Sequence, residues 1–194
     1  MTAKIAIFAS GSGSNFQAIQ QAIENGDLDA QIQIVVTDKP DAFVVRRAEN
    51  FNIPVFSFTA KQYETKAAYE QEIINTLKEL EVEWIILAGY MRLIGSTLLS
   101  IYSNRIVNIH PSLLPSFPGK DAIGQAMEHG VKVTGVTVHF VDEGMDTGPI
   151  LSQAAVEVVE GDRAATEARI HAVEHELYTN TLQKLFKNEI KLVH

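Results

Sequence analysis

The sequence predicts an α/β fold: a mainly parallel sheet with helices on both faces and an antiparallel hairpin toward the C-terminus. Short apolar, β-rich runs recur along the first 110 residues, and helical patterns separate most of them. After a proline-rich stretch, two longer β-rich runs flank a wide loop. At 194 residues and 46% apolar content, the chain can bury one proper core, so we expect a single domain over residues 1–194.

Five runs in the first part of the chain are expected to form parallel strands: Ile5–Ala9, Ile32–Val36, Val55–Phe58, Trp84–Ala88 and Ile106–His110. The clearest helix runs from about Lys66 to Leu80, and Thr65 is its expected N-cap. Apolar residues recur in this helix at three- and four-residue intervals, which predicts one stripe facing the sheet: Tyr69, Ile73, Ile74, Leu77 and Leu80.

The sequence pattern changes after His110, where short apolar runs separated by helical patterns give way to a proline-rich loop. A loop punctuated by prolines leads to a short helix near Ala122–His129. Val133–Val141 alternates like a strand with one solvated face, and Ile150–Val158 is its expected antiparallel partner. The tail from Arg163 to about Lys187 is helical by pattern, and its expected core side consists of Ile170, Val173, Leu177, Leu182 and Leu185.

Composition excludes several classes of function. The net charge of −8 and the lack of any basic run argue against nucleic acid as a partner. Without cysteine there is no disulfide framework, no thiolate zinc site and no cysteine nucleophile. No apolar stretch approaches the length of a membrane span, so we expect a cytoplasmic protein without a membrane partner. Catalysis would fall to His, Asp, Glu, Lys, Ser or Tyr.

The segment Asn108-Ile109-His110-Pro111 is the most informative part of the chain. Side chains alternate along a strand, so Asn108 and His110 should share one face, and Pro111 should end regular pairing just beyond them. An amide donor beside an imidazole suits a reaction that develops an oxyanion. The alternative is that both are ordinary strand-end residues satisfied by loop backbone.

A glycine-rich segment, Ser10-Gly11-Ser12-Gly13-Ser14-Asn15, lies between the first strand and a helix start. Free backbone N–H groups and a helix dipole meet there, which suits a phosphate. Phe16 stands where a dinucleotide fingerprint would have its third glycine, so a single phosphate is favoured over a pyrophosphate. The alternative is a tight turn capped by Ser14 or Asn15.

The loop Asp142–Pro149 contains three carboxylates, of which Asp146 is the candidate partner for His110, because a neighbouring carboxylate favours the imidazolium. The alternative is a merely solvated acidic loop. His139 could face the same cleft, although a strand histidine is more often structural. The segment His171–His175 matches an inverted zinc-protease pattern, but no third ligand follows, so we predict no metal.

Taken together, segment 108–115, loop 142–149 and the glycine segment resemble the folate-dependent formyltransferases over essentially the whole chain, and among them the phosphoribosylglycinamide formyltransferases. The resemblance implies a Rossmann-like formyltransferase domain with a phosphate-binding half over about 1–100 and a folate and catalytic half over about 101–194. It implies formyl transfer from 10-formyltetrahydrofolate to the amine of glycinamide ribonucleotide in purine (IMP) biosynthesis, without metal.

The resemblance also implies site residues. The implied catalytic set is Asn108, His110 and Asp146. The ribonucleotide would be held by Gly13, Ser14, Asn15, His171, Ala172, Val173 and Glu174. The folate would be held by Lys66, Met91, Arg92, Leu93, Ile94, Asn108, Asp142, Glu143, Gly144, Met145 and Asp146. Asp121 and Thr179 depart from residues frequent in the family, namely a histidine and a proline, and neither belongs to the catalytic set.

Two kinds of alternative remain open. Another folate-dependent formyltransferase would share the donor, but a methionyl-tRNA formyltransferase would be expected to carry an additional tRNA-binding domain, and a formyltetrahydrofolate deformylase an N-terminal regulatory domain. A noncatalytic phosphate-binding module would leave Asn108 and His110 structural. The expected partners are two small-molecule substrates, and the expected state is a monomer or homodimer.

Overall fold

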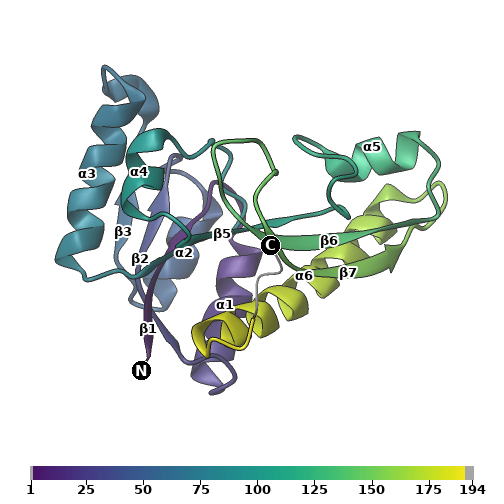
Figure 1. Ribbon diagram of the computed structural model, residues 1–194, viewed down its shortest axis with the longest axis horizontal. Helices are drawn as coiled ribbons and strands as arrows, with labels where there is room; N and C mark the ends of the chain where they lie inside the picture. The colour runs from purple at the N-terminus through teal and green to yellow at the C-terminus, as the bar shows by residue number, and fades with distance from the viewer. Residues whose placement is uncertain (1, 191–194) are drawn as a thin grey trace. The chain divides into compact units, whose positions relative to one another are not determined.

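The computed structural model describes residues 2–190 and divides the chain into two compact units, Met1–Val107 and Asn108–His194, which we describe separately. In hydrogen-bonded order the strands are β3-β2-β1-β4-β5-β6-β7. Strand β5 (Ile106–His110) contributes its first two residues to the first unit and its last three to the second. The predicted α/β class, with parallel strands followed by an antiparallel hairpin, is confirmed (Figure 1).

The first unit is built on parallel strands. These are β1 (Ala3–Phe8), β2 (Ala30–Thr37), β3 (Val55–Ser57) and β4 (Trp84–Leu87). Strand β1 pairs in parallel with both β2 and β4, and β2 pairs in parallel with β3. The central strands are buried on both faces, which is why their sequences are nearly continuous apolar runs.

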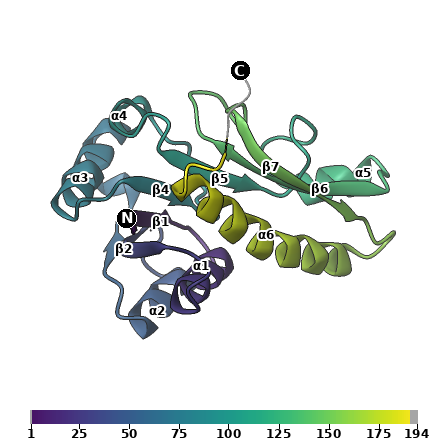
Figure 2. The same cartoon turned by 60° about the horizontal axis from the view of Figure 1, so that its bottom comes forward.

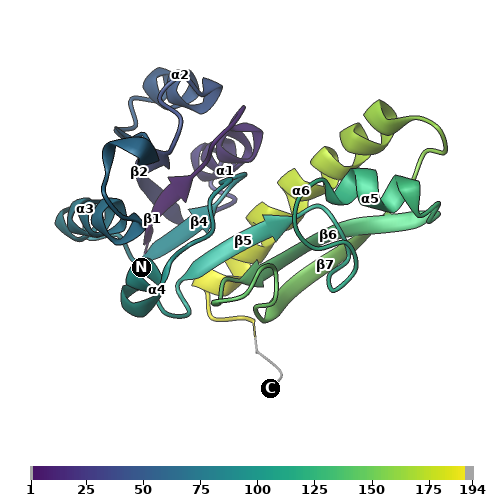
Figure 3. The ribbon, with the colours of Figure 1, turned by 90° about the horizontal axis from the view of Figure 1, so that it is seen from above.

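Helices cover both faces of this sheet, as predicted (Figure 3). Helices α1 (Ser14–Glu24) and α2 (Phe43–Asn50) lie on one face, and α3 (Lys66–Glu79) and α4 (Ser96–Ile101) on the other. A short 3₁₀ turn, Ala60–Gln62, precedes α3.

The α3 helix begins at its predicted cap, because the Thr65 hydroxyl accepts a hydrogen bond from the Ala68 amide at 3.1 Å. Most of the predicted stripe is buried, but Leu80 ends the helix and is only half-buried. A charged residue, Glu70, is buried beside the stripe instead.

The second unit consists of the end of β5, α5 (Ala122–Glu128), β6 (Val133–Phe140), β7 (Ile150–Glu157) and α6 (Arg163–Phe186). The predicted hairpin is confirmed, since β6 and β7 pair antiparallel from Val133–Glu157 to His139–Ile150. Helix α6 runs along the hairpin (Figure 2). Within residues 2–190, no helix has the length and hydrophobicity that a bilayer crossing requires.

Two expectations for this unit are wrong. Strand β6 has no solvated face, because every residue after Val133 is buried. Helix α6 packs against the hairpin, and the segment after β5 covers β6 as well: the Leu114 amide donates to Thr137 Oγ1 at 3.0 Å, and a Cβ on Gly135 would contact Leu113.

The core side of α6 also differs from the prediction. Ile170, Leu182 and Leu185 are buried, but Val173 and Leu177 are only half-buried. Glu174 and Tyr178 take the buried positions between them. The spacing from 170 to 174, 178 and 182 is four residues throughout, so the buried stripe follows a single helix face that apolar residues alone do not mark.

Candidate active site

Four polar side chains converge in the second unit. Asn108 and His110 are supplied by β5, His139 by the end of β6, and Asp146 by the loop between β6 and β7. His110 Nδ1 lies 3.5 Å from Asp146 Oδ2, and His139 Nε2 lies 3.8 Å from Asp146 Oδ1. Asn108 Nδ2 lies 3.3 Å from His139 Nε2. The predicted trio is therefore brought together, and His139 completes it.

The loop before β7 gives its two aspartates different roles. Asp142 shapes the loop, because its carboxylate accepts from the Gly144 amide at 3.0 Å and the Thr147 hydroxyl at 2.7 Å. Asp146 has a left-handed backbone, with φ at 55°, and its carboxylate accepts from the Gly119 amide at 2.8 Å while facing the imidazoles. Aspartate tolerates this conformation better than most residues.

His110 is engaged through both ring nitrogens. Nε2 lies 2.9 Å from the carbonyl oxygen of Phe117, which can only accept, so Nε2 carries a hydrogen and donates it. Nδ1 faces the Asp146 carboxylate. A carbonyl oxygen and a carboxylate therefore face the two ring nitrogens of His110.

His139 is suited to the neutral state. It is only 2% exposed, and burial lowers its pKa, although the Phe140 carbonyl and the Asp146 charge oppose that shift. Nδ1 lies 2.8 Å from the Phe140 carbonyl and so carries the hydrogen. Nε2 is then the acceptor for one N–H of Asn108, which orients the amide and leaves its second N–H for a ligand.

The glycine segment lies in the first unit, where β1 leads into α1. Gly13 is the N-cap of α1 with φ at 74°, and no side chain caps the helix, so the predicted alternative of a Ser14 or Asn15 cap is not seen. A Cβ on Gly13 would lie 2.7 Å from Val44 of α2. Arg47 of α2 donates from Nε to the Ser12 carbonyl at 2.7 Å, which places a cation beside these amides.

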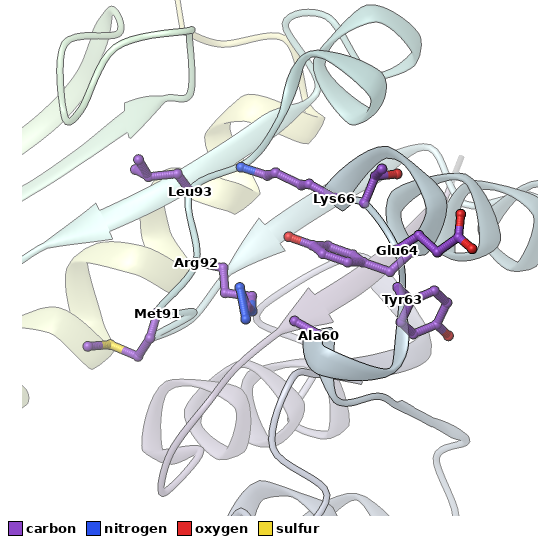
Figure 4. Close-up of a pocket in the computed structure, with 9 residues that line it drawn as sticks. Ala60, Tyr63, Glu64, Lys66, Met91, Arg92 and Leu93 are labelled. Carbon is purple, nitrogen blue, oxygen red and sulfur yellow. The ribbon is translucent and has the colours of Figure 1, made fainter.

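A cavity of about 470 Å³ lies in the same unit (Figure 4). Two segments line it: the start of α3 with the turn before it, and the loop after β4. Four residues predicted for the folate line this cavity, namely Lys66, Met91, Arg92 and Leu93, whereas Ile94 is half-buried and does not. Lys66 extends from α3 toward Leu93, and Arg92 lies between the two segments.

On α6, His171 and Glu174 form an ion pair, with Nδ1 and Oε2 2.8 Å apart. The Glu174 side chain is 7% exposed and the His171 side chain 53% exposed. The hydrogen bond to Glu174 raises the pKa of His171. Ala172 is exposed and Val173 half-buried. Among the described residues, no group of three or more His, Asp or Glu is arranged to hold a metal ion.

The predicted site residues thus form two sets. Gly13 to Asn15, Lys66 and Met91 to Ile94 belong to the first unit, and the remaining residues to the second. Sequence reasoning missed two buried carboxylates that support the first set, Asp38 and Glu70. A signal existed for each: Asp38 follows β2 directly, and Glu70 interrupts the apolar stripe of α3.

Comparison with known proteins agrees with this chemistry. The formyl transferase family matches residues 3–182. The phosphoribosylglycinamide formyltransferase of Bacillus subtilis (strain 168) is 57% identical over 183 residues, which cover 94% of each protein.

Two crystal structures give similar matches. Glycinamide ribonucleotide transformylase 1 from Geobacillus kaustophilus has a TM-score of 0.93 and 58% identity, covering 95% of this chain and 99% of that one. Phosphoribosylglycinamide formyltransferase from Bacillus halodurans has a TM-score of 0.93 and 53% identity, covering 96% of both chains. This chain belongs to the formyl transferase family.

Proposed function

We propose that this enzyme transfers the formyl group of 10-formyltetrahydrofolate to the amine of phosphoribosylglycinamide, giving the N-formyl product and tetrahydrofolate in purine (IMP) biosynthesis. The observation that carries the proposal is the convergence of Asn108, His110, His139 and Asp146 in a chain 57% identical to a phosphoribosylglycinamide formyltransferase. It acts on small molecules in the cytoplasm, as a monomer or homodimer.

The reaction begins when the glycinamide nitrogen attacks the formyl carbon. The carbonyl oxygen gains negative charge as the tetrahedral intermediate forms, and it accepts hydrogen bonds from the free N–H of Asn108 and from His110. Collapse breaks the bond between the formyl carbon and N10. The attacking nitrogen loses a proton and N10 gains one, so no covalent enzyme intermediate is needed.

Asp146 supports this chemistry through charge and position. Its carboxylate lies 3.5 Å from Nδ1 of His110, which fixes the plane of the ring. The Phe117 carbonyl and the formyl oxygen are both acceptors for the N–H at Nε2 of His110.

The two substrates are recognised by different means. The acceptor's phosphate is bound by the amides at the start of α1, with Arg47 adding positive charge, and His171 to Glu174 contact the rest of the ribonucleotide. In the first unit, the donor is bound at the cavity that Lys66 and Arg92 line, because two cations suit the carboxylates of a folate's glutamate tail. In the second unit, Asn108 and residues 142–146 complete the folate-binding set.

The test is a formyl-transfer assay with purified protein, 10-formyltetrahydrofolate and phosphoribosylglycinamide, in which tetrahydrofolate release and the formylated product are both measured. We expect one product per folate consumed. Methionyl-tRNA serves as the control acceptor and should not be formylated, in keeping with the charge of −8. Tight binding of the ribonucleotide without any product would favour a noncatalytic module and refute the proposal.

A further inference from the structure

The loop between β4 and α4 supplies three of the residues that line the cavity, yet it has no regular structure of its own. Met91 and Leu93 are 62% and 59% exposed, so core packing does not fix their positions. Arg92 lies between them and is half-buried. Something else must hold this segment, residues 91–95, because a binding wall built on a mobile loop loses affinity through ordering entropy.

One end of the segment is held through Asp38, at the end of β2. The Ser10 hydroxyl donates to Asp38 Oδ1 at 2.5 Å and accepts from the Met91 amide at 2.9 Å. Arg92 Nε lies 3.2 Å from Asp38 Oδ2, and the Asp38 side chain is only 9% exposed. The guanidinium also lies over the Tyr69 ring, 5.6 Å from its centroid. Asp38 thus orients both the backbone and the cation at this end.

The other end is held through Glu70, from the middle of α3. Glu70 is 1% exposed, and its carboxylate accepts from the Gly95 amide at 2.7 Å and the Leu98 amide at 3.2 Å. A Cβ on Gly95 would lie within 3 Å of both Glu70 oxygens, so a side chain there would have to displace the carboxylate. Backbone amides satisfy a buried carboxylate that would otherwise be costly.

We propose that Asp38 and Glu70 are positioning residues for the formyl donor, which together fix segment 91–95 at the cavity wall. Neither carboxylate lines the cavity, so each acts through the backbone or through Arg92 rather than by touching the ligand. The donor role rests on the proposed function. The fixing of the segment rests on the contacts alone.

The test compares Asp38→Asn and Glu70→Gln with the wild-type enzyme. Asp38→Asn keeps an acceptor for Ser10 and removes the charge that holds Arg92. Glu70→Gln leaves one oxygen for two amides. Each should raise the Kd for tetrahydrofolate, measured by titration calorimetry, and the KM for 10-formyltetrahydrofolate by about tenfold. This is the size expected for the loss of one ion pair at Asp38 or one charge-assisted hydrogen bond at Glu70. The KM for phosphoribosylglycinamide should stay within about twofold, because Asp38 contacts the glycine-rich segment only at Ser10 and Glu70 not at all, whereas the residues proposed to bind the phosphate are Gly13, Ser14 and Asn15.

Two exposed carboxylates provide matched controls. Asp41 is three residues from Asp38 in the chain, and Glu79 is on the same helix as Glu70. Asp41→Asn and Glu79→Gln should leave the Kd for tetrahydrofolate and both KM values unchanged. Thermal melts of all four variants separate lost positioning from lost fold. If Glu70→Gln does not fold, Asp38→Asn and Ser10→Ala carry the test, since both act at the other end of the segment.

Amide hydrogen exchange gives a readout that does not depend on activity. The Met91 and Gly95 amides should exchange faster in the Asp38 and Glu70 variants than in the wild type. Unchanged folate binding in stable variants, or equal rises in KM for both substrates, would overturn the proposal. A wild-type enzyme that transferred no formyl group would instead refute the proposed function and the donor role, and faster exchange would still show that the carboxylates fix the segment.

Discussion

The two units use opposite chemistry at their candidate sites. In the first unit the predicted ligand contacts are backbone amides at the start of α1 and cations beside a cavity, supported by buried carboxylates outside it. In the second unit two imidazoles, one carboxylate and one amide face one another within 3.8 Å. Groups of the first kind bind and orient, whereas groups of the second kind carry charge and protons. Changes at the start of α1 and at the cavity should therefore act on KM, and changes at the four converging side chains of the second unit should act on kcat.

The largest expected effect is on turnover. His110→Ala and Asp146→Asn should each lower kcat by about 10²–10⁴, the usual worth of a general acid–base group, while the KM values change little. Steady-state kinetics with both substrates varied measures this. Glu128→Gln, an exposed carboxylate in the same unit, is the control. Near wild-type turnover in the His110 variant would contradict a catalytic role for the side chains that converge in the second unit.

A smaller effect is expected at the glycine segment. Gly13→Ala adds a Cβ that would meet Val44 at 2.7 Å and forces an L-residue to a φ of 74°. We expect the KM for phosphoribosylglycinamide to rise about tenfold, consistent with ~1–2 kcal/mol of left-handed strain, while kcat at saturation is retained. Gly26→Ala is matched in backbone strain, with φ at 81° and no atom within 4 Å. If Gly26→Ala raised the same KM equally, strain alone would explain the result.

The helix caps allow a comparison of stability between the units. Thr65 caps α3 and Asp162 caps α6, each accepting from the amide three residues on. Replacing either with alanine should lower the free energy of unfolding by about 1 kcal/mol and Tm by roughly 2–4 °C in a thermal melt. Thr59→Ala is the control, because the Thr59 side chain caps nothing. Equal losses at Thr59 and Thr65 would contradict the cap assignment.

The smallest effects concern pH, and we consider them at two histidines of the second unit, His139 and His171. Burial lowers the pKa of His139, so below the unfolded value of about 6.5 the unfolded chain binds more protons and stability falls with acidification. The pKa of His171 is raised by Glu174, so its contribution is complete below that value and is lost as the pH rises through the folded pKa.

Melts between pH 5 and 8 test both signs. His139→Asn should flatten the acid side of the stability profile, and His171→Asn the side above pH 6.5. Each variant is the control for the other, because the pH ranges in which they change stability lie on opposite sides of the pKa of an unfolded histidine. A profile that flattened on the same side in both variants would contradict this assignment.

Local pattern was enough for most of the fold. The strands, the α3 helix with its Thr65 cap and the β6–β7 hairpin are confirmed, because each depends on residues near in sequence. The prediction failed where burial depends on distant partners. Val173 and Leu177 are apolar but half-buried, whereas Glu174 is charged and buried beside His171. Strand β6 is covered on the face predicted to be solvated, because segment 111–115 packs on it.

The sequence by itself determined the α/β class and identified Asn108, His110 and Asp146 as a set, since a strand's alternation and an acidic loop are written in neighbouring residues. Only the tertiary structure decided that His139 orients Asn108 and that His110 donates to the Phe117 carbonyl. It also decided that contacts of Asp38, through Ser10, and of Glu70 hold the amides of Met91 and Gly95. The physical reason is that a hydrogen bond or an ion pair requires its partner within a few ångströms, and only folding brings these partners, which lie between 7 and 81 positions apart, to that distance.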